Sequence, residues 1–437
     1  MSFSLFLKAF VMLFFFAIAQ VTIASDEHQN PKCIGKIHLL QVVECVLEHS
    51  PEYRHEKLEL GVREGRKIVN SYLFPSNPFF SFSQSMRYGE QENLLGQSNK
   101  GYFLNGEILL SQEIFISSIR KAKIQSSEIQ INSQHVKLEI IRRETIVEAI
   151  KASIRYENSK KIYLETEKLY NIATRLYNVV FERVKAGALA PIDADLAYAE
   201  VLKIKKLYEL AKRQHNKYKA NLTVMMGVNF SSPLEIIFIP DKIEIKEKNL
   251  EKLLEYGLKN RPEILLAEQN ILFQRKNSEI LALERIPNLT ISGFIQKDGF
   301  NENVVGLRVG LPLRVWRTQK VELLENSFKE KQAQELKEIQ SHRIRQEIIE
   351  AIQNFESLSS ELESYSKENL KNFETSLKNV QKAMQNGQIS IKDGLTTQQY
   401  FMNAKLSYLE TLSEWLVAGI EVLRASGLSI LEFELEK

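Results

Sequence analysis

The two halves of this 437-residue chain repeat each other at a distance of about 200 residues. Three positions recur at one constant offset, since Gly187, Asp193 and Gly227 return as Gly387, Asp393 and Gly427. Earlier in each copy, the stretch 48–52 returns as 259–263 and the stretch 73–75 returns as 285–287. A period of this length indicates two similar structural units, so each element predicted in one half is expected again in the other.

Each copy contains a long stretch that has neither glycine nor proline. The first lies within residues 107–186 and leaves room, after a strand, for roughly 67 helical residues, or about 100 Å at about 1.5 Å per residue. The second runs from Leu313 to Asn386 and is rich in good helix formers. We therefore predict two uninterrupted helical rods of equal length, far longer than a globular domain holds.

Shorter helices are expected to pair with each rod in an antiparallel coiled coil. Two of them return over Pro191–Met226 and Ile391–Ser426, and each ends at a glycine suited to a left-handed cap. The helices that open each copy, about 37–73 and 248–284, have the complementary length for end-to-end stacking. The domain organisation is then a signal peptide over 1–24, an N-terminal segment over 25–36, a first repeat over 37–227, a belt at mid-height over 228–247, a second repeat over 248–430 and a C-terminal tail over 431–437.

The first residues are typical of a secretory signal peptide, because Lys8 precedes the apolar run Ala9–Ala19 and small residues follow up to Ala24. An uncleaved membrane anchor is the alternative, although that run is short for a bilayer.

In the oxidising compartment that export implies, Cys33 and Cys45 are candidates for a disulfide, with two free thiols as the alternative. No later stretch is apolar enough for a transmembrane helix, so a membrane crossing would have to use strands.

Between the opening helix and the rod of each copy, side-chain polarity alternates with a period of two residues, which predicts strands. The clearest case is 305–311, where valine and leucine occupy the odd positions and glycine and arginine the even ones. The runs 80–87, 102–111 and 289–296 alternate less regularly. Each approaches the length of a tilted membrane strand, with one face suited to lipid and the other to water. An ordinary soluble sheet packed on helices is the alternative.

Aromatic residues near the predicted strand ends, Tyr88, Tyr102, Phe115 and Trp316, fit the interface between a membrane and water. Four strands leave two open edges, and lipid cannot supply partners for the backbone groups along them. Several copies must then share one barrel. Two copies would give eight strands and a filled interior, whereas three give twelve strands and room for a water-filled lumen; four copies are the alternative.

The charged residues give no sign of a nucleic-acid or catalytic site. The 58 basic and 55 acidic residues are interspersed, with a formal net charge of +3 at pH 7, so no basic block is available for nucleic acid. The chain contains no phosphate-binding loop, nucleophile elbow or metal-ligand spacing, and its 7 histidines are scattered. We therefore expect no enzyme activity, no cofactor and no bound metal.

Over residues 37–430 the chain resembles the outer membrane efflux (TolC) family. The resemblance is carried by the paired Pro-Glu helix starts, the turn 309–313, the strand-proline segments 74–78 and 285–292, and the two helical tips 185–193 and 385–393. Within the family, the segments 284–287 and 311–313 look most like the heavy-metal (CzcC-like) members.

The resemblance implies a mainly α fold with a β-barrel portion. Long antiparallel helices would form a periplasmic α-barrel, and four transmembrane strands per protomer would form a twelve-stranded barrel in a homotrimer. It implies a passive duct in the outer membrane of a Gram-negative bacterium, served by a periplasmic adaptor (membrane fusion) protein and an inner-membrane transporter. Heavy-metal cations or drugs would be the cargo, and a type I secretion outlet is the alternative. A periplasmic coiled-coil adaptor and a soluble structural protein are further alternatives.

The two tips are predicted to be tight turns. Gly187 and Gly387 can take a positive φ, and Pro191 suits the first turn of the next helix. The resemblance implies that the residues contacting the adaptor are Gly187, Ala190, Pro191, Gly387 and Ser390.

Three carboxylates near the tips, Asp193, Asp195 and Asp393, are candidates for a ring that constricts the pore and favours cations. Capping of the returning helices is the alternative role for them. The Tyr and Arg that brace the closed mouth in multidrug members correspond here to Met384 and Ile389, and their second Asp corresponds to Thr396. That particular brace is therefore expected to be absent.

Overall fold

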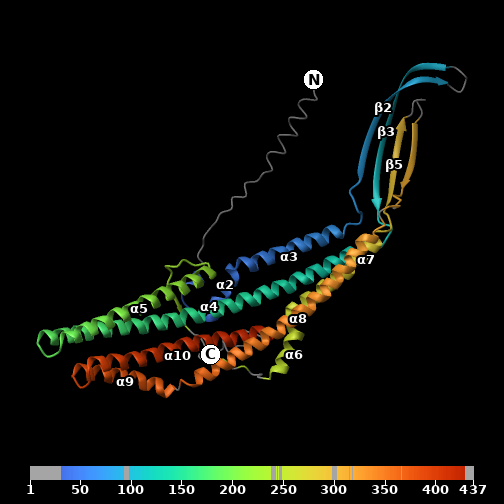
Figure 1. Ribbon diagram of the computed structural model, residues 1–437. Helices are drawn as coiled ribbons and strands as arrows, with labels where there is room; N and C mark the ends of the chain where they lie inside the picture. Colours follow the sequence, from blue (N-terminus) through green and yellow to red (C-terminus); the bar gives the residue numbers. More distant parts are fainter. Residues whose placement is uncertain are drawn as a thin grey trace, which may run out of the picture.

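Long helices lie side by side over most of the molecule, and a four-stranded sheet extends from one end of them (Figure 1). The computed structural model describes residues 31–92, 98–237, 243, 245, 249–297, 303–313, 315–316, 318–365 and 367–428. The predicted signal peptide over 1–24 and the tail over 431–437 lie outside these ranges. None of the described helices is both long and apolar enough to cross a membrane.

The two copies of the repeat have the same order of helices and strands. After a short turn, η1 (Pro31–Cys33), and strand β1 (Gly35–Ile37), the first copy contains α2 (Leu39–His49), α3 (Pro51–Asn70), β2 (Phe79–Glu92), β3 (Ser98–Ile114), α4 (Ile119–Lys185) and α5 (Pro191–Met225). After strand β4 (Leu234–Ile236), the second copy contains α6 (Leu250–Asn260), α7 (Pro262–Leu283), β5 (Leu289–Lys297), β6 (Asn303–Gly310), α8 (Lys320–Glu363), α9 (Lys367–Gln385) and α10 (Ile391–Ser426).

The first predicted rod is confirmed, since α4 has 67 residues without a break. The prediction of an uninterrupted second rod from 313 to 386 is wrong. Helix α8 starts only after Gln319, which has a φ of 53°, and it ends at Glu363, so that α9 begins again at Lys367. This break falls in the serine-rich run 357–366, and serine hydroxyls compete with the helix for backbone hydrogen bonds.

Each opening helix was also expected to be single, and each is divided by a proline. Pro51 begins α3 and Pro262 begins α7, while the residues before them, Ser50 and Arg261, are extended, with ψ of 117° and 126°. Proline has no N–H to donate and disfavours the helical conformation in the residue before it. The returning helices are confirmed, because α5 and α10 end within one residue of their predicted ends.

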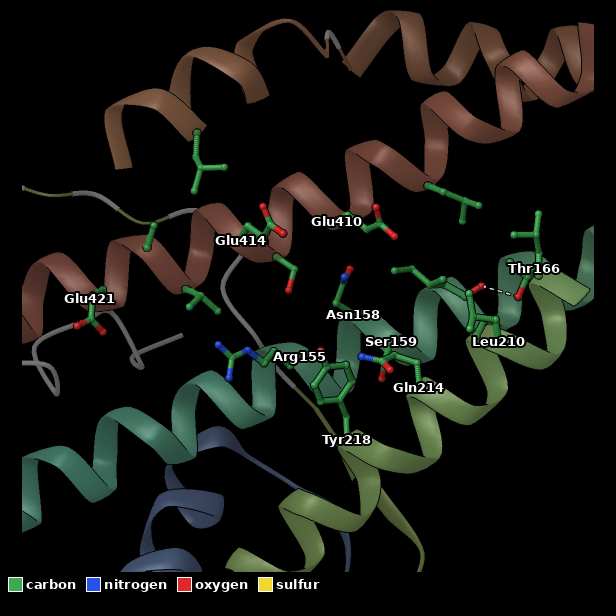
Figure 2. A pocket seen from close by; sticks show the side chains of 18 of the residues that line it. Arg155, Asn158, Ser159, Thr166, Leu210, Gln214, Tyr218, Glu410, Glu414 and Glu421 are labelled. Carbon is green, nitrogen blue, oxygen red and sulfur yellow. Dashed lines mark hydrogen bonds between the residues drawn. The ribbon is translucent and has the colours of Figure 1, made fainter. Parts of the chain in front are cut away.

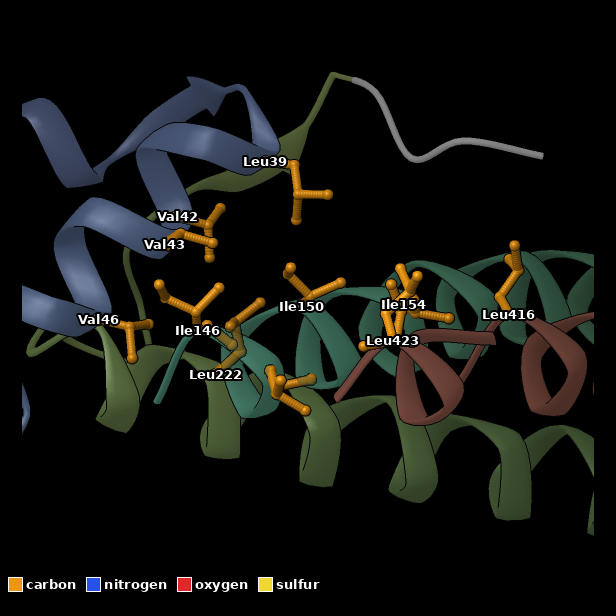
Figure 3. Close-up of a cluster of buried hydrophobic side chains, with 14 of the residues drawn as sticks. Leu39, Val42, Val43, Val46, Ile146, Ile150, Ile154, Leu222, Leu416 and Leu423 are labelled. Atoms are coloured by element: carbon orange, nitrogen blue, oxygen red, sulfur yellow. The ribbon is translucent and has the colours of Figure 1, made fainter. Parts of the chain in front are cut away.

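The main apolar core lies where α2, α4, α5 and α10 meet, partway along the long helices (Figure 3). Strand β1 pairs in parallel with β4 beside this core, and Ile243 and Ile245 of the predicted belt are buried in it. The belt residues 238–242, 244 and 246–247 lie outside the described ranges. Cys33 and Cys45 form a disulfide, as their spacing suggested, and it attaches the chain before β1 to α2.

Beside this core, a buried arginine links three helices of the second copy. Arg261 is only 4% exposed and binds Glu263 through two nitrogens, while its Nη1 lies 2.6 Å from a carboxylate oxygen of Glu347 on α8. Burial disfavours the charge of Arg261, but the hydrogen bonds that its guanidinium donates to both glutamates outweigh burial and raise the pKa of Arg261. The same glutamate of α8 also accepts from Arg424 of α10 at 3.3 Å. This ionic network therefore joins α7, α8 and α10.

Stacked rings run along the contact between α4 and α5. Tyr156, His215, Tyr163, Tyr208 and Tyr170 follow one another with ring centroids 5.3 to 5.7 Å apart. The three tyrosines of α4 are seven residues apart, and so are the two residues of α5, which is the spacing of a coiled-coil seam. We call this set the ring ladder; it stiffens the first helical hairpin.

His215 titrates within this ladder. The Ser159 hydroxyl donates its one hydrogen to the carbonyl oxygen of Tyr156 at 2.6 Å, so Nδ1 of His215 donates to the Ser159 oxygen at 3.2 Å. Burial, followed by the positive charges of Lys160 and Lys219, lowers the pKa of His215 below its ordinary value. The folded protein therefore binds this proton more weakly than the unfolded chain does.

Acidification is expected to weaken the α4–α5 contact. The stabilising contribution of neutral His215 is complete above its unfolded-state pKa of about 6.5 and is lost as the pH falls from there through its folded-state pKa. We predict a larger drop in melting temperature from pH 7.5 to pH 5.5 in the wild type than in His215→Phe, which keeps an aromatic ring but does not titrate. Equal drops in the two proteins would contradict this assignment.

Candidate functional site

The four long strands form one antiparallel sheet in the order β2, β3, β5, β6. Strands β2 and β3 have 14 and 17 residues, more than the sequence predicted, whereas β5 and β6 have 9 and 8. Strand β3 pairs with β5 only between Gly106 and Ile114. The far part of the β2–β3 hairpin therefore extends beyond the β5–β6 hairpin (Figure 1).

The two faces of this sheet differ in polarity, as the alternation predicted. Large apolar side chains on one face are exposed: Phe80, Phe82, Met86, Ile108, Leu110, Ile291, Ile295, Val305, Leu307 and Val309. The opposite face carries Ser81, Ser83, Glu107, Ser111, Ser292, Gln296 and Arg308. A contiguous apolar surface of this size marks a contact with lipid or with another protein.

The polar face contains a set of contacts between strands that the sequence did not reveal. The ring of Phe294 on β5 lies over Gly306 of β6, where an added Cβ would approach the ring to 2.5 Å. The guanidinium of Arg308 lies 5.2 Å from the centre of that ring, and its Nη2 is 3.5 Å from Glu107 of β3. These contacts connect three strands and fix their register from the polar side.

Neither margin of the sheet is paired with another of the described strands. Among the described strands, β2 has β3 as its single neighbour and β6 has β5. An edge of this length offers a row of free N–H and C=O groups that another strand can pair with.

The two tips lie at the opposite end of the molecule from the sheet (Figure 1). They are the turn between α4 and α5 and the turn between α9 and α10, in which Gly187 and Gly387 both have a φ of 75°. The predicted tip residues Ala190, Pro191 and Ser390 follow these glycines, and all three are exposed, as are the two glycines.

The three pore candidates are found beside these turns. Asp193 accepts a hydrogen bond from the Ala190 amide at 3.2 Å. Asp393 accepts from the Ser390 hydroxyl at 2.6 Å, while its own amide donates to that hydroxyl at 3.1 Å. The Asp193 carboxylate thus caps the start of α5, whereas the Asp393 carboxylate supports the Ser390 hydroxyl that caps α10. Asp393 and Asp195 are both exposed.

An apolar contact joins the two tips. Met384 of α9 is only 1% exposed and packs with Val180 of α4, Ala197 of α5 and Ile391 of α10. It lies over Gly394, where an added Cβ would come within 2.2 Å of its sulfur. Met384 is thus part of an apolar contact between the two tips, which we call the tip seam.

One buried polar side chain interrupts this apolar packing. Gln398 of α10 is 3% exposed, and neither its Nε2 nor its Oε1 has a hydrogen-bond partner in the described part of the chain. It lies one helical turn from Gly394 and one turn from Met402, which is buried against α4 and α5. An unpaired buried amide costs about 1–3 kcal/mol, so the tip seam is weaker than its apolar contacts suggest.

Between the tip seam and the central core, a cleft of about 800 Å³ separates α10 and α8 from α4 and α5 (Figure 2). Glu410 and Glu414 of α10 face Asn158 and Gln214 across it, and Arg155 also lines it. Burial and the nearby Glu414 raise the pKa of Glu410. Helix α10 therefore contacts the first hairpin from its tip as far as Lys405, whose ammonium lies 2.8 Å from Glu165 of α4, and again at the core. The cleft separates them in between.

The described residues contain no group of three or more His, Cys, Asp or Glu side chains that could hold a metal ion. No model of a protein family matches the chain. No curated protein matches its sequence either.

The fold, in contrast, matches solved structures over almost its full length. A structure of CusC, described in terms of folding and transmembrane channel formation, aligns with a TM-score of 0.70 at 12% identity and covers 91% of this chain and 93% of that chain. The Campylobacter jejuni CmeC outer membrane channel aligns with a TM-score of 0.68 at 16% identity, covering 89% and 85%. The Vibrio cholerae outer membrane protein VceC aligns with a TM-score of 0.69 at 14% identity, covering 90% and 96%. These likenesses confirm the expected fold class.

Replacing the unpaired amide is expected to strengthen the tip seam. Gln398→Leu keeps a similar volume and removes the buried polar group, so it should stabilise the contact between the hairpins by about 1–3 kcal/mol. Slower amide hydrogen exchange in α9 and the start of α10 would measure this gain. The same substitution at the exposed turn residue Gln388 is the control and should have no effect. Faster exchange in Gln398→Leu would show that the amide is satisfied after all.

Proposed function

We propose that this chain is one protomer of a passive homotrimeric channel in the outer membrane of a Gram-negative bacterium. The observation that carries the proposal is the sheet, which has one exposed apolar face and two unpaired edges. In lipid, every unpaired backbone group costs several kcal/mol, so such a sheet has to be closed by further strands. Strand β2 of one copy would pair with β6 of the next.

The number of copies follows from the interior of the closed sheet. Three copies of four strands make a twelve-stranded barrel, wide enough for a water-filled lumen lined by the polar face. Two copies would give an eight-stranded barrel whose interior side chains fill. The proposal gives the chain no catalytic role and no cofactor, and its selectivity would lie in the size and charge of the duct.

The helical part would extend the duct through the periplasm. Helix α4 alone is about 100 Å long at about 1.5 Å per residue. Its tip and that of α9–α10 are the ends farthest from the sheet, which suits contact with a periplasmic adaptor through Gly187, Ala190, Pro191, Gly387 and Ser390. An inner-membrane transporter would supply the energy. A periplasmic adaptor as the alternative identity would have a single helical hairpin, whereas this chain has two.

The nature of the cargo is part of the same proposal. The likeness of 284–287 and 311–313 to heavy-metal members makes divalent metal cations the first cargo to test, ahead of drugs and polypeptides. Loss of metal tolerance in a deletion strain, restored by the wild-type gene, is the expected result.

Purified protein tests the channel itself. We expect a detergent-extracted trimer that migrates more slowly on a gel before heating than after, when it has dissociated into single chains. The same trimer should conduct ions in a planar bilayer, because a closed barrel requires the sheets of all three copies. A stable monomer that stays in solution without detergent would contradict the proposal.

The cation preference of the mouth is expected to depend on Asp393. Asp393→Asn keeps a hydrogen-bond acceptor for the Ser390 hydroxyl and removes three negative charges from the trimer, so selectivity for cations should fall while the fold is kept. Ser390→Ala is the matched control, since it breaks the cap and leaves the charge. Bilayer reversal potentials under a salt gradient report the difference. If both variants keep the wild-type reversal potential, Asp393 only supports the helix cap and has no role in ion selectivity.

A further inference from the structure

The cleft between the two hairpins is lined by polar groups that the protein leaves without partners. Glu410 and Glu414 lie one helical turn apart on α10, and neither carboxylate has an ion-pair or hydrogen-bond partner among the described residues. Asn158 and Gln214 face them from α4 and α5, and their amides have no hydrogen bond to a described residue either (Figure 2). Like charges at this spacing destabilise a helix, so a positive partner for the two glutamates would stabilise α10.

A buried hydroxyl lies in the wall of the same cleft. Ser413 lies between the two glutamates in the sequence of α10, lines the cleft and is only 8% exposed. Other serines within these helices, such as Ser153 and Ser426, donate to the carbonyl oxygen four residues earlier at 2.7 Å, whereas Ser413 has no hydrogen-bond partner in the described part of the chain. Buried polar groups are nearly always hydrogen-bonded. A guest molecule in the cleft would therefore gain a hydrogen bond that the protein itself leaves unmade.

The charges that line the cleft do not balance. Glu421 is neutralised, because it binds both Lys151 of α4 and Arg424 of α10. Among the described residues of the lining, Arg155 is the one cation, and it has no ion-pair partner there or elsewhere in the described chain. The two unpaired glutamates outnumber it, so the cleft attracts positive charge. The raised pKa of Glu410 agrees with this, since partial burial and a like charge nearby both disfavour its ionised form.

Leucines from three helices supply apolar surface beside these polar groups: Leu207 and Leu210 of α5, Leu358 of α8 and Leu406 of α10. The volume of the cleft, about 800 Å³, is within the range of about 300–1,000 Å³ that is typical of sites for small molecules. A bare metal ion would leave the leucines uncovered, and a neutral apolar molecule would leave the carboxylates without a counter-charge. A positively charged molecule with apolar rings matches both parts of the lining.

We propose that this cleft binds a lipophilic organic cation, whose positive group contacts Glu410 and Glu414 and whose apolar rings pack on the leucines of α5, α8 and α10. A passive duct needs no such site, so the inference goes beyond the proposed function and does not depend on the number of copies that assemble. Because the cleft lies between the two hairpins of one chain, the bound cation contacts both of them. It therefore joins the hairpins at the level where the protein itself leaves them apart.

Ethidium is a suitable probe, because it combines a permanent positive charge with an apolar ring system and amino groups that donate hydrogen bonds. Its fluorescence anisotropy is titrated with full-length protein purified in a neutral detergent. We expect saturable binding to the wild type with one ethidium per chain. The fluorescent anion 8-anilinonaphthalene-1-sulfonate, which is also apolar but carries the opposite charge, is the probe control and should bind more weakly.

Charge variants of the two walls should change the affinity in opposite directions. Glu410→Gln and Glu414→Gln keep the shape of the side chain, and each should weaken ethidium binding about five-fold by removing one partly exposed ionic contact. Arg155→Gln removes the like charge and should tighten binding about two-fold or more, which general damage to the fold would not do. Glu356→Gln, at an exposed position of α8 outside the lining, is the matched control and should have no effect.

Equal ethidium affinities in the wild type and in both glutamine variants would overturn the proposal, because the dye would then bind elsewhere or enter only the detergent. Anion binding as tight as that of ethidium would also overturn it, since the cleft would then be no more than an apolar surface. Ion conductance of the same preparations separates this failure from that of the proposed function. A conducting protein without the ethidium site disproves the site alone, whereas a protein that binds ethidium but neither forms trimers nor conducts disproves the channel.

Discussion

The unsatisfied hydrogen-bonding capacity of two sheet edges is the constraint on which the rest of this structure depends. Strands β2 and β6 each have one neighbour among the described strands, while the face between them is covered with exposed apolar side chains. Water could form hydrogen bonds with the edges but would leave the apolar face exposed to solvent. Lipid could cover the apolar face but could not form hydrogen bonds with the edges. Copies of the same sheet would satisfy both, and in the proposed channel insertion and assembly would then have to occur together.

A shared sheet also determines how the helices leave it. The connections to α3, α4, α7 and α8 are all at one end of the strands, and contacts such as those of Arg120 hold them there. In the proposed channel, the rods would therefore start at fixed positions around a closed ring and run in the same direction. Partway along, the core at α2, α4, α5 and α10, the disulfide and the Arg261 network hold the two hairpins of each protomer together.

The sequence was most informative where one physical rule acts along the chain. Alternation in 305–311 predicted the faces of β6, and the absence of glycine and proline from 107–186 predicted α4 almost to the residue. The split at Pro51 was missed because the helical pattern continues on both sides of it. Contacts between distant segments, such as Glu107 with Arg308 or Met384 with Val180, leave no periodic signal and needed the folded chain.

The same comparison shows that the two copies of the repeat differ in the continuity of their long helix. The first hairpin has an unbroken rod and the ring ladder, whereas the rod of the second is interrupted between Glu363 and Lys367. The second tip is held to the first by a seam that contains the unpaired amide of Gln398, with a polar cleft behind it. In a trimer, hairpins with an unbroken long helix would alternate with hairpins whose long helix is interrupted, around the end of the duct formed by the tips. Widening it would then require three apolar seams to separate, and none of the three unbroken rods would have to bend.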